Sequence, residues 1–458
     1  MAEINAHMFR EYDIRGVAGK DLTPECAELI GKAFGTYLIR KKQRDLVLGR
    51  DARLSSPTLH DALVNGINST GVNVIDIGLA TWGFVNYSLR KQTGNAVFIS
   101  ASHNPAEYNG FKLVLQEESV PGSEIKKLLA LIQNKDFEIS QGNYYEVNLF
   151  DEYLNFLSSK VTLNKFNNTK KSRFVVDYGN GMAAMVGPKL FKQLGLNPIE
   201  LFNEVDCTFP NHLADPSHAE TLKDLVAKVK ETNADFGIAF DGDGDRLGVV
   251  DENGNIFAGD QLLAIFAKDV LKGNPGGKIV LEVKCSQALK ELIAAKNGVA
   301  IESPVGHTYI ERALVKEKAL LGGELSGHFF FADKFYGIDD AVYNALRFIQ
   351  IVNDASVSVS HFLDDYPKYF ASPEIRPFCS DETKEQIVSQ IAQEFKNEGY
   401  NVSTLDGVKV YFENGWGGLR KSNTAPLLSF RCEGKTKEAM EKIREIFATK
   451  LKKHGIEI

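Results

Sequence analysis

Strand-like apolar runs alternate with helix-like stretches along most of the chain, and this order occurs three times. The first repeat joins a run at 45–50 to a helix from Pro57, then runs at 72–78 and 96–99. Strands that alternate with helices favour α/β units with largely parallel strand pairing. No sequence identity links the repeats, so the repetition lies in the order of elements.

The second and third repeats end, like the first, in an unusual polar motif. The second has strands within 173–177, 196–203 and 234–240 and helices at 183–194 and 221–233; the third has strand-like segments at 278–286, 298–306 and 318–328 and helices at 287–296 and 309–317. The terminal motifs are SASHNP (100–105), DGDGDR (241–246) and GELSGH (323–328). Because open α/β sheets bind ligands beyond the carboxyl ends of their strands, we expect the motifs to face one composite site.

The pattern changes from about Pro367. A helix-like stretch at 385–399 is followed by strand-like runs at 406–415 and 426–434 and a long helix at 436–455. This order predicts a small α+β domain, and two prolines near 365–373 mark its start. We therefore expect four domains, at 1–150, 151–255, 256–366 and 367–458.

Composition is that of an ordinary globular protein and narrows the function classes. A chain of 458 residues is too long for one core, and 43% hydrophobic and 25% charged residues are typical values. A net charge of -7 without a Lys/Arg cluster argues against nucleic-acid binding. Five scattered cysteines without a CxxC indicate reduced thiols. The N-terminal stretch has no apolar signal region and no 18-residue apolar run occurs, so we expect a cytoplasmic protein without a membrane partner.

The run at 96–99 leads into a loop that carries Ser102. A hydroxyl flanked by small residues at the end of a buried strand is a candidate nucleophile, although a polar loop of turn-forming residues is the alternative. We expect a turn at Asn109-Gly110 to bring Lys112 back to this loop. Ser102 and His103 would diverge in an extended segment, and no GxSxG is present, which argues against a serine hydrolase. No GxxxxGK[ST] occurs, which argues against phosphoryl transfer from ATP.

The motif DGDGDR predicts a metal site. Asp241, Asp243 and Asp245 alternate with glycines that let three carboxylates converge, and such oxygens suit a hard divalent cation, Mg²⁺ above all. A calcium EF-hand fails because Arg246 stands where glycine is needed and the flanks are strands. A solvated acidic loop is the remaining alternative.

Three weaker motifs carry groups suited to a sugar phosphate. RKSNTAP (420–426) supplies Arg420 and hydroxyls for a phosphate, or forms an ordinary basic turn. GELSGH presents Glu324, Ser326 and His328 alternately from a strand end, where a carboxylate suits vicinal hydroxyls. For FREYDIRG (9–16) the alternative to a functional role is a salt-bridged first strand. For His307 the alternative is a purely structural role.

Together SASHNP, DGDGDR, GELSGH and RKSNTAP resemble the α-D-phosphohexomutase family, most closely its bacterial phosphomannomutase/phosphoglucomutase branch. The resemblance implies three related α/β domains with mixed sheets plus a C-terminal α+β domain, heart-shaped around one central cleft. It implies Ser102, Lys112, His307 and Arg246 as catalytic residues, with Lys112 and His307 the proton-transfer candidates. It implies Asp241, Asp243, Asp245 and Ser102 as metal ligands. The implied substrate-binding residues are Tyr12, Arg15, His103, Lys284, Glu324, Ser326, His328, Arg420, Ser422, Asn423 and Thr424.

The implied reaction is the reversible conversion of hexose 1-phosphate to hexose 6-phosphate. Phospho-Ser102 would transfer its phosphoryl group with Mg²⁺, through a bound hexose 1,6-bisphosphate, in a monomer or weak dimer. Departures from the family pattern are Trp82 where Pro is usual, Thr308 where Lys is common, and Ala425 where Glu or Thr is common. A phosphoglucosamine mutase is one alternative, against which Leu325 speaks. A metal-dependent sugar phosphatase and an inactive sugar-phosphate sensor are the others.

Overall fold

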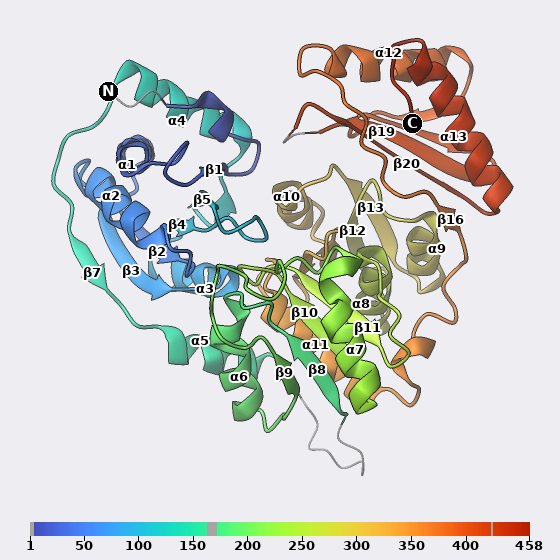
Figure 1. The fold of residues 1–458 in the computed structure, drawn as a ribbon, viewed down its shortest axis with the longest axis horizontal. Coiled ribbons are helices and arrows are strands. Elements are labelled where there is room, and N and C mark those ends of the chain that lie inside the picture. The colour runs from blue at the N-terminus through green and yellow to red at the C-terminus, as the bar shows by residue number, and fades with distance from the viewer. Residues whose placement is uncertain (1–3, 163–171, 423–424) are drawn as a thin grey trace. The chain divides into compact units, whose positions relative to one another are not determined.

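The computed structural model describes residues 4–162, 172–422 and 425–458 (Figure 1). The chain folds into two compact units, each discontinuous in sequence. The first comprises Met1–Gly259 and Ser326–Phe362, and the second comprises Asp260–Leu325 and Leu363–Ile458. None of the helices in the described ranges is long and apolar enough to cross a membrane.

A mixed sheet opens the first unit, with strand order β1-β5-β4-β2-β3-β7 and β6 paired to β5. Its strands are β1 (Ile14–Val17), β2 (Asp45–Arg50), β3 (Asn73–Leu79), β4 (Ala96–Ile99), β5 (Tyr108–Leu115), β6 (Glu118–Ser119) and β7 (Tyr144–Glu146). The neighbouring helices are α1 (Pro24–Arg40), α2 (Ser56–Asn68), α3 (Trp82–Gln92), α4 (Gly122–Asn134) and α5 (Phe150–Ser159), after a short 3-10 turn at Ala6–Met8. The apolar faces of α1, α2 and α4 share one core with the sheet, so the strand ends carry the polar groups.

A second mixed sheet has the order β11-β10-β8-β9. Its strands are β8 (Phe174–Asp177), β9 (Ile199–Leu201), β10 (Phe236–Phe240) and β11 (Leu247–Asp251). The helices α6 (Ala183–Gln193), α7 (Lys223–Thr232, after a 3-10 turn at Ala219–Leu222) and α11 (Ala341–Asp354) and the strand β15 (Phe329–Phe331) complete this unit, with a 3-10 turn at Val359–His361. The strands β10 and β11 are buried at every position, which fixes the loop between them.

In the second unit, β12 (Lys278–Glu282) pairs in parallel with β13 (Val299–Ser303) and β14 (Leu321–Gly323). Its helices are α8 (Gly259–Gly273), α9 (Gln287–Ala295) and α10 (His307–Glu317). An antiparallel sheet follows, with order β16-β20-β19-β18-β17. It comprises β16 (Phe370–Ala371), β17 (Asn401–Ser403), β18 (Val408–Phe412), β19 (Gly415–Lys421) and β20 (Leu428–Gly434). Two helices, α12 (Lys384–Asn397) and α13 (Lys437–Lys452), pack on it through one core (Figure 1).

The predicted α/β class with mixed sheets and an antiparallel C-terminal sheet is confirmed. One local prediction is wrong: Asn109 and Gly110 lie inside β5, and the chain reverses earlier, between Ala101 and Glu107. Gly110 pairs with Arg15 of β1, so a third strand keeps this dipeptide extended.

Candidate active site

The candidate nucleophile Ser102 lies in the loop between two antiparallel strands, β4 and β5. Its backbone is left-handed, with φ of 50°, and its side chain is buried. The hydroxyl donates to Asp241 Oδ2 at 2.6 Å and lies 3.1 Å from His103 Nδ1. The expected divergence of Ser102 and His103 is therefore wrong, because the loop is not extended at this point.

The three aspartates lie in the tight connection between β10 and β11. Asp241 Oδ1 accepts hydrogen bonds from the backbone amides of Gly244, Asp245 and Arg246 at 3.0, 2.9 and 3.1 Å. A Cβ at Gly242 would lie 2.2 Å from the carbonyl oxygen of Ser102, so only glycine lets the two loops approach this closely. The loop at 241–246 (the candidate metal loop) and the loop at 100–107 (the candidate nucleophile loop) are thereby packed against each other.

Lys112 neutralises part of this acidic group. Its Nζ lies 2.7 Å from Asp243 Oδ2 and 2.6 Å from Asp245 Oδ2, above the indole ring of Trp82. Burial lowers the pKa of Lys112, but the surrounding carboxylates raise it by more, so it stands well above its usual value. Lys112 therefore stays charged beside these carboxylates.

The acidic group fits a divalent cation. Oxygens of Asp241, Asp243 and Asp245 lie within 4.8 Å of one another, and all three side chains are buried. Asp243 Oδ1 and Asp245 Oδ1 have no hydrogen-bond partner among the described residues. Burial and the two neighbouring carboxylates raise the pKa of Asp241 well above its usual value. Unsatisfied, crowded carboxylate oxygens are the donor set of a hard cation.

A chain of polar contacts extends from this group. Arg246 Nε donates to His328 Nε2 at 3.0 Å, and His328 Nδ1 lies 2.9 Å from Asp339 Oδ2. Since Nε2 accepts, Nδ1 carries the proton and donates to Asp339. Residues 324–327 belong to no strand, with a turn at 325–326, and His328 makes an isolated bridge with Arg246. The expectation that Glu324, Ser326 and His328 alternate along a strand end is therefore wrong.

Two further predicted residues of the first unit lie beside the nucleophile loop. Arg15 donates to Asn104 Oδ1 and to Asp13 Oδ2, both at 2.6 Å. Burial, with Arg246 and Arg15 nearby, lowers the pKa of His103 well below its usual value. Arg15 Nε is buried without a hydrogen-bond partner among the described residues, so this guanidinium has donor capacity left for an anion. Tyr12 and Ser326 are partly exposed in the same unit.

A second group of predicted residues lies in the second unit. Glu324 Oε1 accepts from the backbone amide of Gly306 at 2.6 Å, directly before His307, the first residue of α10. Lys284 Nζ lies 3.3 Å from Glu374 Oε1 and 3.7 Å from Glu282 Oε1. The structure therefore brings Glu324 and the His307 loop together, with Lys284 following β12.

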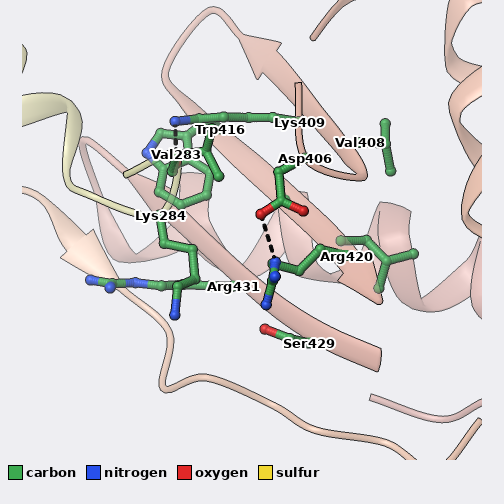
Figure 2. Close-up of a pocket in the computed structure, with 11 residues that line it drawn as sticks. Val283, Lys284, Asp406, Val408, Lys409, Trp416, Arg420, Ser429 and Arg431 are labelled. Atoms are coloured by element: carbon green, nitrogen blue, oxygen red, sulfur yellow. Dashed lines mark hydrogen bonds and ion pairs between the residues drawn. The ribbon is translucent and has the colours of Figure 1, made fainter. Parts of the chain in front are cut away.

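Arg420 and Lys284 line one pocket, shown in Figure 2. Arg420 Nε donates to Asp406 Oδ2 at 2.9 Å, and the same oxygen accepts from the amide of Val305 at 3.0 Å. Arg420 belongs to β19, so it projects from a paired strand where a loop was expected. Ser422 Oγ accepts from the amide of Ala425 at 3.2 Å. Asn423 and Thr424 lie outside the described residues.

Lys409 joins the two sheets of the second unit at this pocket (Figure 2). Its Nζ donates to the carbonyl oxygen of Val283 at 2.6 Å and to Glu302 Oε1 at 2.8 Å, and lies 4.2 Å from the centre of the Trp416 ring. Burial, with Lys290 nearby, lowers the pKa of Lys409 to about 8. Lys409 of β18 thus holds Val283, the residue before Lys284.

Sequence reasoning missed several residues that order these groups. Asp339 binds Trp82 and Asp406 binds the amide of Val305, which are 257 and 101 residues away in sequence, so no local pattern marks these acids. Arg53 follows β2 within GRDAR, where the available signal is an arginine two residues after an acid at the end of a buried strand. The sequence marked Trp82 only as a residue that stands where proline is usual in the family pattern.

Comparison with known proteins places all four parts of the chain in one family. The phosphoglucomutase/phosphomannomutase alpha/beta/alpha domains I, II and III match residues 6–139, 151–254 and 258–369. The C-terminal domain of the same family matches residues 375–450.

Relatives and a solved structure agree with this match. The chain is 40% identical over 445 residues to phosphomannomutase/phosphoglucomutase of Pseudomonas putida, covering 97% of this chain and 95% of that protein. It is 38% identical over 452 residues to a phosphoglucomutase of Neisseria meningitidis, covering 98% and 97%. A crystal structure of a phosphoglucomutase/phosphomannomutase family protein from Burkholderia thailandensis covers 98% of both chains with a TM-score of 0.92 and 36% identity. The chain therefore belongs to the phosphoglucomutase/phosphomannomutase family.

Proposed function

We propose that the chain is an isomerase that interconverts hexose 1-phosphates and hexose 6-phosphates of glucose and mannose. In this proposal phospho-Ser102 donates its phosphoryl group to the free sugar hydroxyl, and the resulting 1,6-bisphosphate returns its other phosphate to Ser102. The observation that carries the proposal is the 2.6 Å contact between Ser102 Oγ and Asp241, inside a buried acidic group with unsatisfied oxygens.

The first unit is assigned the transfer step. Asp241, Asp243 and Asp245, with Ser102, would hold Mg²⁺, which when bound offsets charge on the transferring group. Phosphoserine adds about -1.5 to -2 charges near pH 7, so cations of the chain are also needed. Arg246 and Lys112 supply them, and Arg15 holds the loop through Asn104.

Proton transfer is assigned to His307. Carboxylates on Asp243 and Asp245 hold the proton on Lys112, which makes Lys112 a charge-balancing group and a poor base. His307 begins α10, and a histidine imidazole is the commonest side chain for proton transfer to or from a reacting hydroxyl.

Binding of the phosphate that is not transferred is assigned to the second unit, and sugar binding to residues of each unit. One oxygen of Glu324 is fixed by the amide of Gly306, which orients the carboxylate for a pair of vicinal hydroxyls. Arg420, oriented by Asp406, and Lys284 supply positive charge for the phosphate that is not transferred. Ser422, Asn423 and Thr424 are assigned to the same phosphate, and Tyr12, His103, Ser326 and His328 to the sugar.

We also infer four domains at 1–150, 151–255, 256–366 and 367–458. The separate matches to family domains I, II, III and the C-terminal domain support this division. A phosphosugar is the only partner that the proposed reaction needs.

The test is an isomerisation assay with glucose, mannose and glucosamine 1-phosphates, Mg²⁺ and a trace of glucose 1,6-bisphosphate. Phosphorus NMR follows the 1-phosphate, the 6-phosphate and free phosphate together. We expect 6-phosphates without net phosphate release, and loss of most turnover in Ser102→Ala with substrate binding retained. Stoichiometric phosphate release would indicate a phosphatase, and binding without conversion a sensor. A strong preference for the glucosamine substrate would favour the glucosamine branch.

A further inference from the structure

The backbone of the nucleophile loop needs an external support. Ser102 has φ of 50°, a region that residues with a Cβ seldom occupy without constraint from their surroundings. Within the loop, Ser102 N donates to Ser100 Oγ at 2.9 Å and Asn104 N donates to the carbonyl of Ala101 at 3.0 Å. The Pro105 carbonyl also accepts locally, from the amide of Tyr108 at 3.0 Å, but among the described residues the carbonyls of Ser102 and Asn104 have no main-chain donor.

Arg53 supplies that support. Its side chain is buried, and Nη2 donates to the carbonyl oxygens of Ser102 and Asn104 at 2.8 and 2.7 Å. Its Nη1 donates to the carbonyl oxygens of Pro105 and Tyr108 at 2.6 and 2.9 Å. One guanidinium therefore binds four main-chain carbonyls of the segment that carries the nucleophile.

Arg53 is itself held rigidly. Its Nε donates to Asp51 Oδ2 at 3.1 Å, and its backbone amide donates to Asp51 Oδ1 at 3.1 Å. Ser56 Oγ donates to that same Oδ1 at 2.6 Å, and the guanidinium lies 5.3 Å from the centre of the Phe209 ring. The cation is thus paired, and every nitrogen of its planar fork is bound.

We propose that Arg53 is a positioning residue for phosphoryl transfer, which fixes Ser102 Oγ toward Asp241 by binding the carbonyls of the nucleophile loop. The inference rests on the proposed function. Carbonyl oxygens carry partial negative charge and would repel a phosphoryl group on Ser102. Bound to Arg53, these four oxygens are directed to the guanidinium. A lysine ammonium is a compact point charge with three donors and cannot bind four carbonyls in one plane.

The test compares Arg53→Lys with Arg347→Lys. Arg347 is also buried and ion-paired, to Asp333 at 2.8 Å, but it lies in α11, where its guanidinium is close to the rings of Phe331 and Tyr343. For Arg53→Lys we expect kcat to fall about 10²-fold with KM nearly unchanged, because small misplacement of a reacting group has this effect. The rate at which glucose 1,6-bisphosphate phosphorylates Ser102, measured by intact-mass spectrometry, should fall together with kcat. Arg347→Lys should lose stability and keep kcat.

A kcat for Arg53→Lys equal to that of Arg347→Lys would overturn the proposal. If Arg53→Lys does not fold, Ser56→Ala loosens Asp51 without removing a buried charge, and an unchanged kcat in that variant would overturn it. If the wild-type protein isomerises no hexose phosphate, the proposed function fails. The positioning role of Arg53 is then tested by the crystal structure of Arg53→Lys. A crystal structure of Arg53→Lys with Ser102 still left-handed and its Oγ still on Asp241 would then overturn the positioning role.

Discussion

Trp82 donates its indole Nε1–H to Asp339 Oδ1 across 2.7 Å. The other oxygen of Asp339 lies 2.9 Å from His328 Nδ1, while the backbone amide of Trp82 donates to the carbonyl of Asp243 at 2.9 Å. One residue therefore contacts both the backbone of the metal loop and the carboxylate that orients His328. A proline at this position could not make the amide contact.

Replacing Trp82 by Phe should destabilise the protein and weaken metal binding. The change leaves a buried carboxylate oxygen without its donor, which costs about 2 kcal/mol of unfolding free energy. The matched control is Trp416→Phe, which removes an indole bond to Glu433 Oε2 at 2.9 Å. Urea unfolding and Mg²⁺ titration calorimetry check the result. Equal metal affinity in the two variants would contradict a role for Trp82 at the metal loop.

Removing the metal should abolish phosphoryl transfer and lower thermal stability. A ligand present at 100 times its Kd stabilises the folded state by about 2.7 kcal/mol. We expect Mg²⁺ to raise the Tm of the wild-type protein and of Asp251→Asn, and to leave that of Asp243→Asn unchanged. Asp251 is a suitable control because it is a buried carboxylate at the end of β11, outside the acidic group. Full activity after rigorous chelation would end the hypothesis.

Arg420→Ala should raise KM more than it lowers kcat. The proposed contact to the phosphate that is not transferred exists in the ground state and the transition state alike. Loss of charge-assisted hydrogen bonds should raise KM about 10- to 100-fold. The control is Arg376→Ala, since Arg376 is an exposed arginine of the same unit that pairs with Glu374. Steady-state kinetics in both directions give the answer, and an unchanged KM would contradict the assignment.

Stability should fall as His60 loses its proton. Burial lowers the pKa of His60, but hydrogen bonds to Asp76 and Asp61 raise it by more, so it stands above its usual value. A raised pKa in the folded state contributes stability fully below the unfolded value of about 6.5, and this is lost as the pH rises through the folded pKa.

Urea unfolding of the wild-type protein and His60→Gln between about pH 6 and pH 9 tests this. The difference in unfolding free energy should shrink toward high pH. Most of the effect should come from Asp76, which is 2.9 Å from Nε2 and buried, because Asp61 is largely exposed and screened. Parallel curves would show that His60 does not titrate differently in the folded state.

Glucose 1-phosphate and mannose 1-phosphate should be used with kcat/KM values within about 10²-fold of each other. The reaction needs the sugar in two orientations related by a half-turn, which roughly exchanges O3 with O4. Glu324 can bind that pair both ways, whereas the C2 hydroxyl moves to a different place. A site that reads one hydroxyl directly can discriminate by about 10⁴, so a ratio of that size would contradict the argument.

Local patterns predicted most of the secondary structure, because buried strands such as β4 and β10 carry their apolar signal within a few residues. The Asn109-Gly110 turn failed because its signal was overruled by tertiary pairing. A Cβ at Gly110 would lie 2.6 Å from the carbonyl oxygen of Ile14 and 3.0 Å from that of Ser100. Gly110 permits this close approach of two other backbone segments. The sequence Asn-Gly does not by itself distinguish this role from that of a turn.

The candidate site also contains some residues that local patterns predict and others that only the fold brings together. The convergence of the aspartates of DGDGDR could be predicted because three carboxylates alternate with glycines in one short loop. Asp339 could not, since its partners Trp82 and His328 approach it only through the fold. The backbone of Ser102 is also bound by an arginine 49 residues away, so local patterns predict the candidate nucleophile but not the arginine that contacts it.

The first unit is interrupted in sequence, and this determines when its reaction centre can form during translation. The metal loop is made early, but His328 and Asp339 belong to Ser326–Phe362, which follows residues 260–325 of the other unit. At about 5–20 residues per second, the ribosome adds this whole intervening segment before the first unit has its last helix. A nascent chain that stops before His328 therefore carries the acidic loop without the histidine that lies beside it in the finished protein.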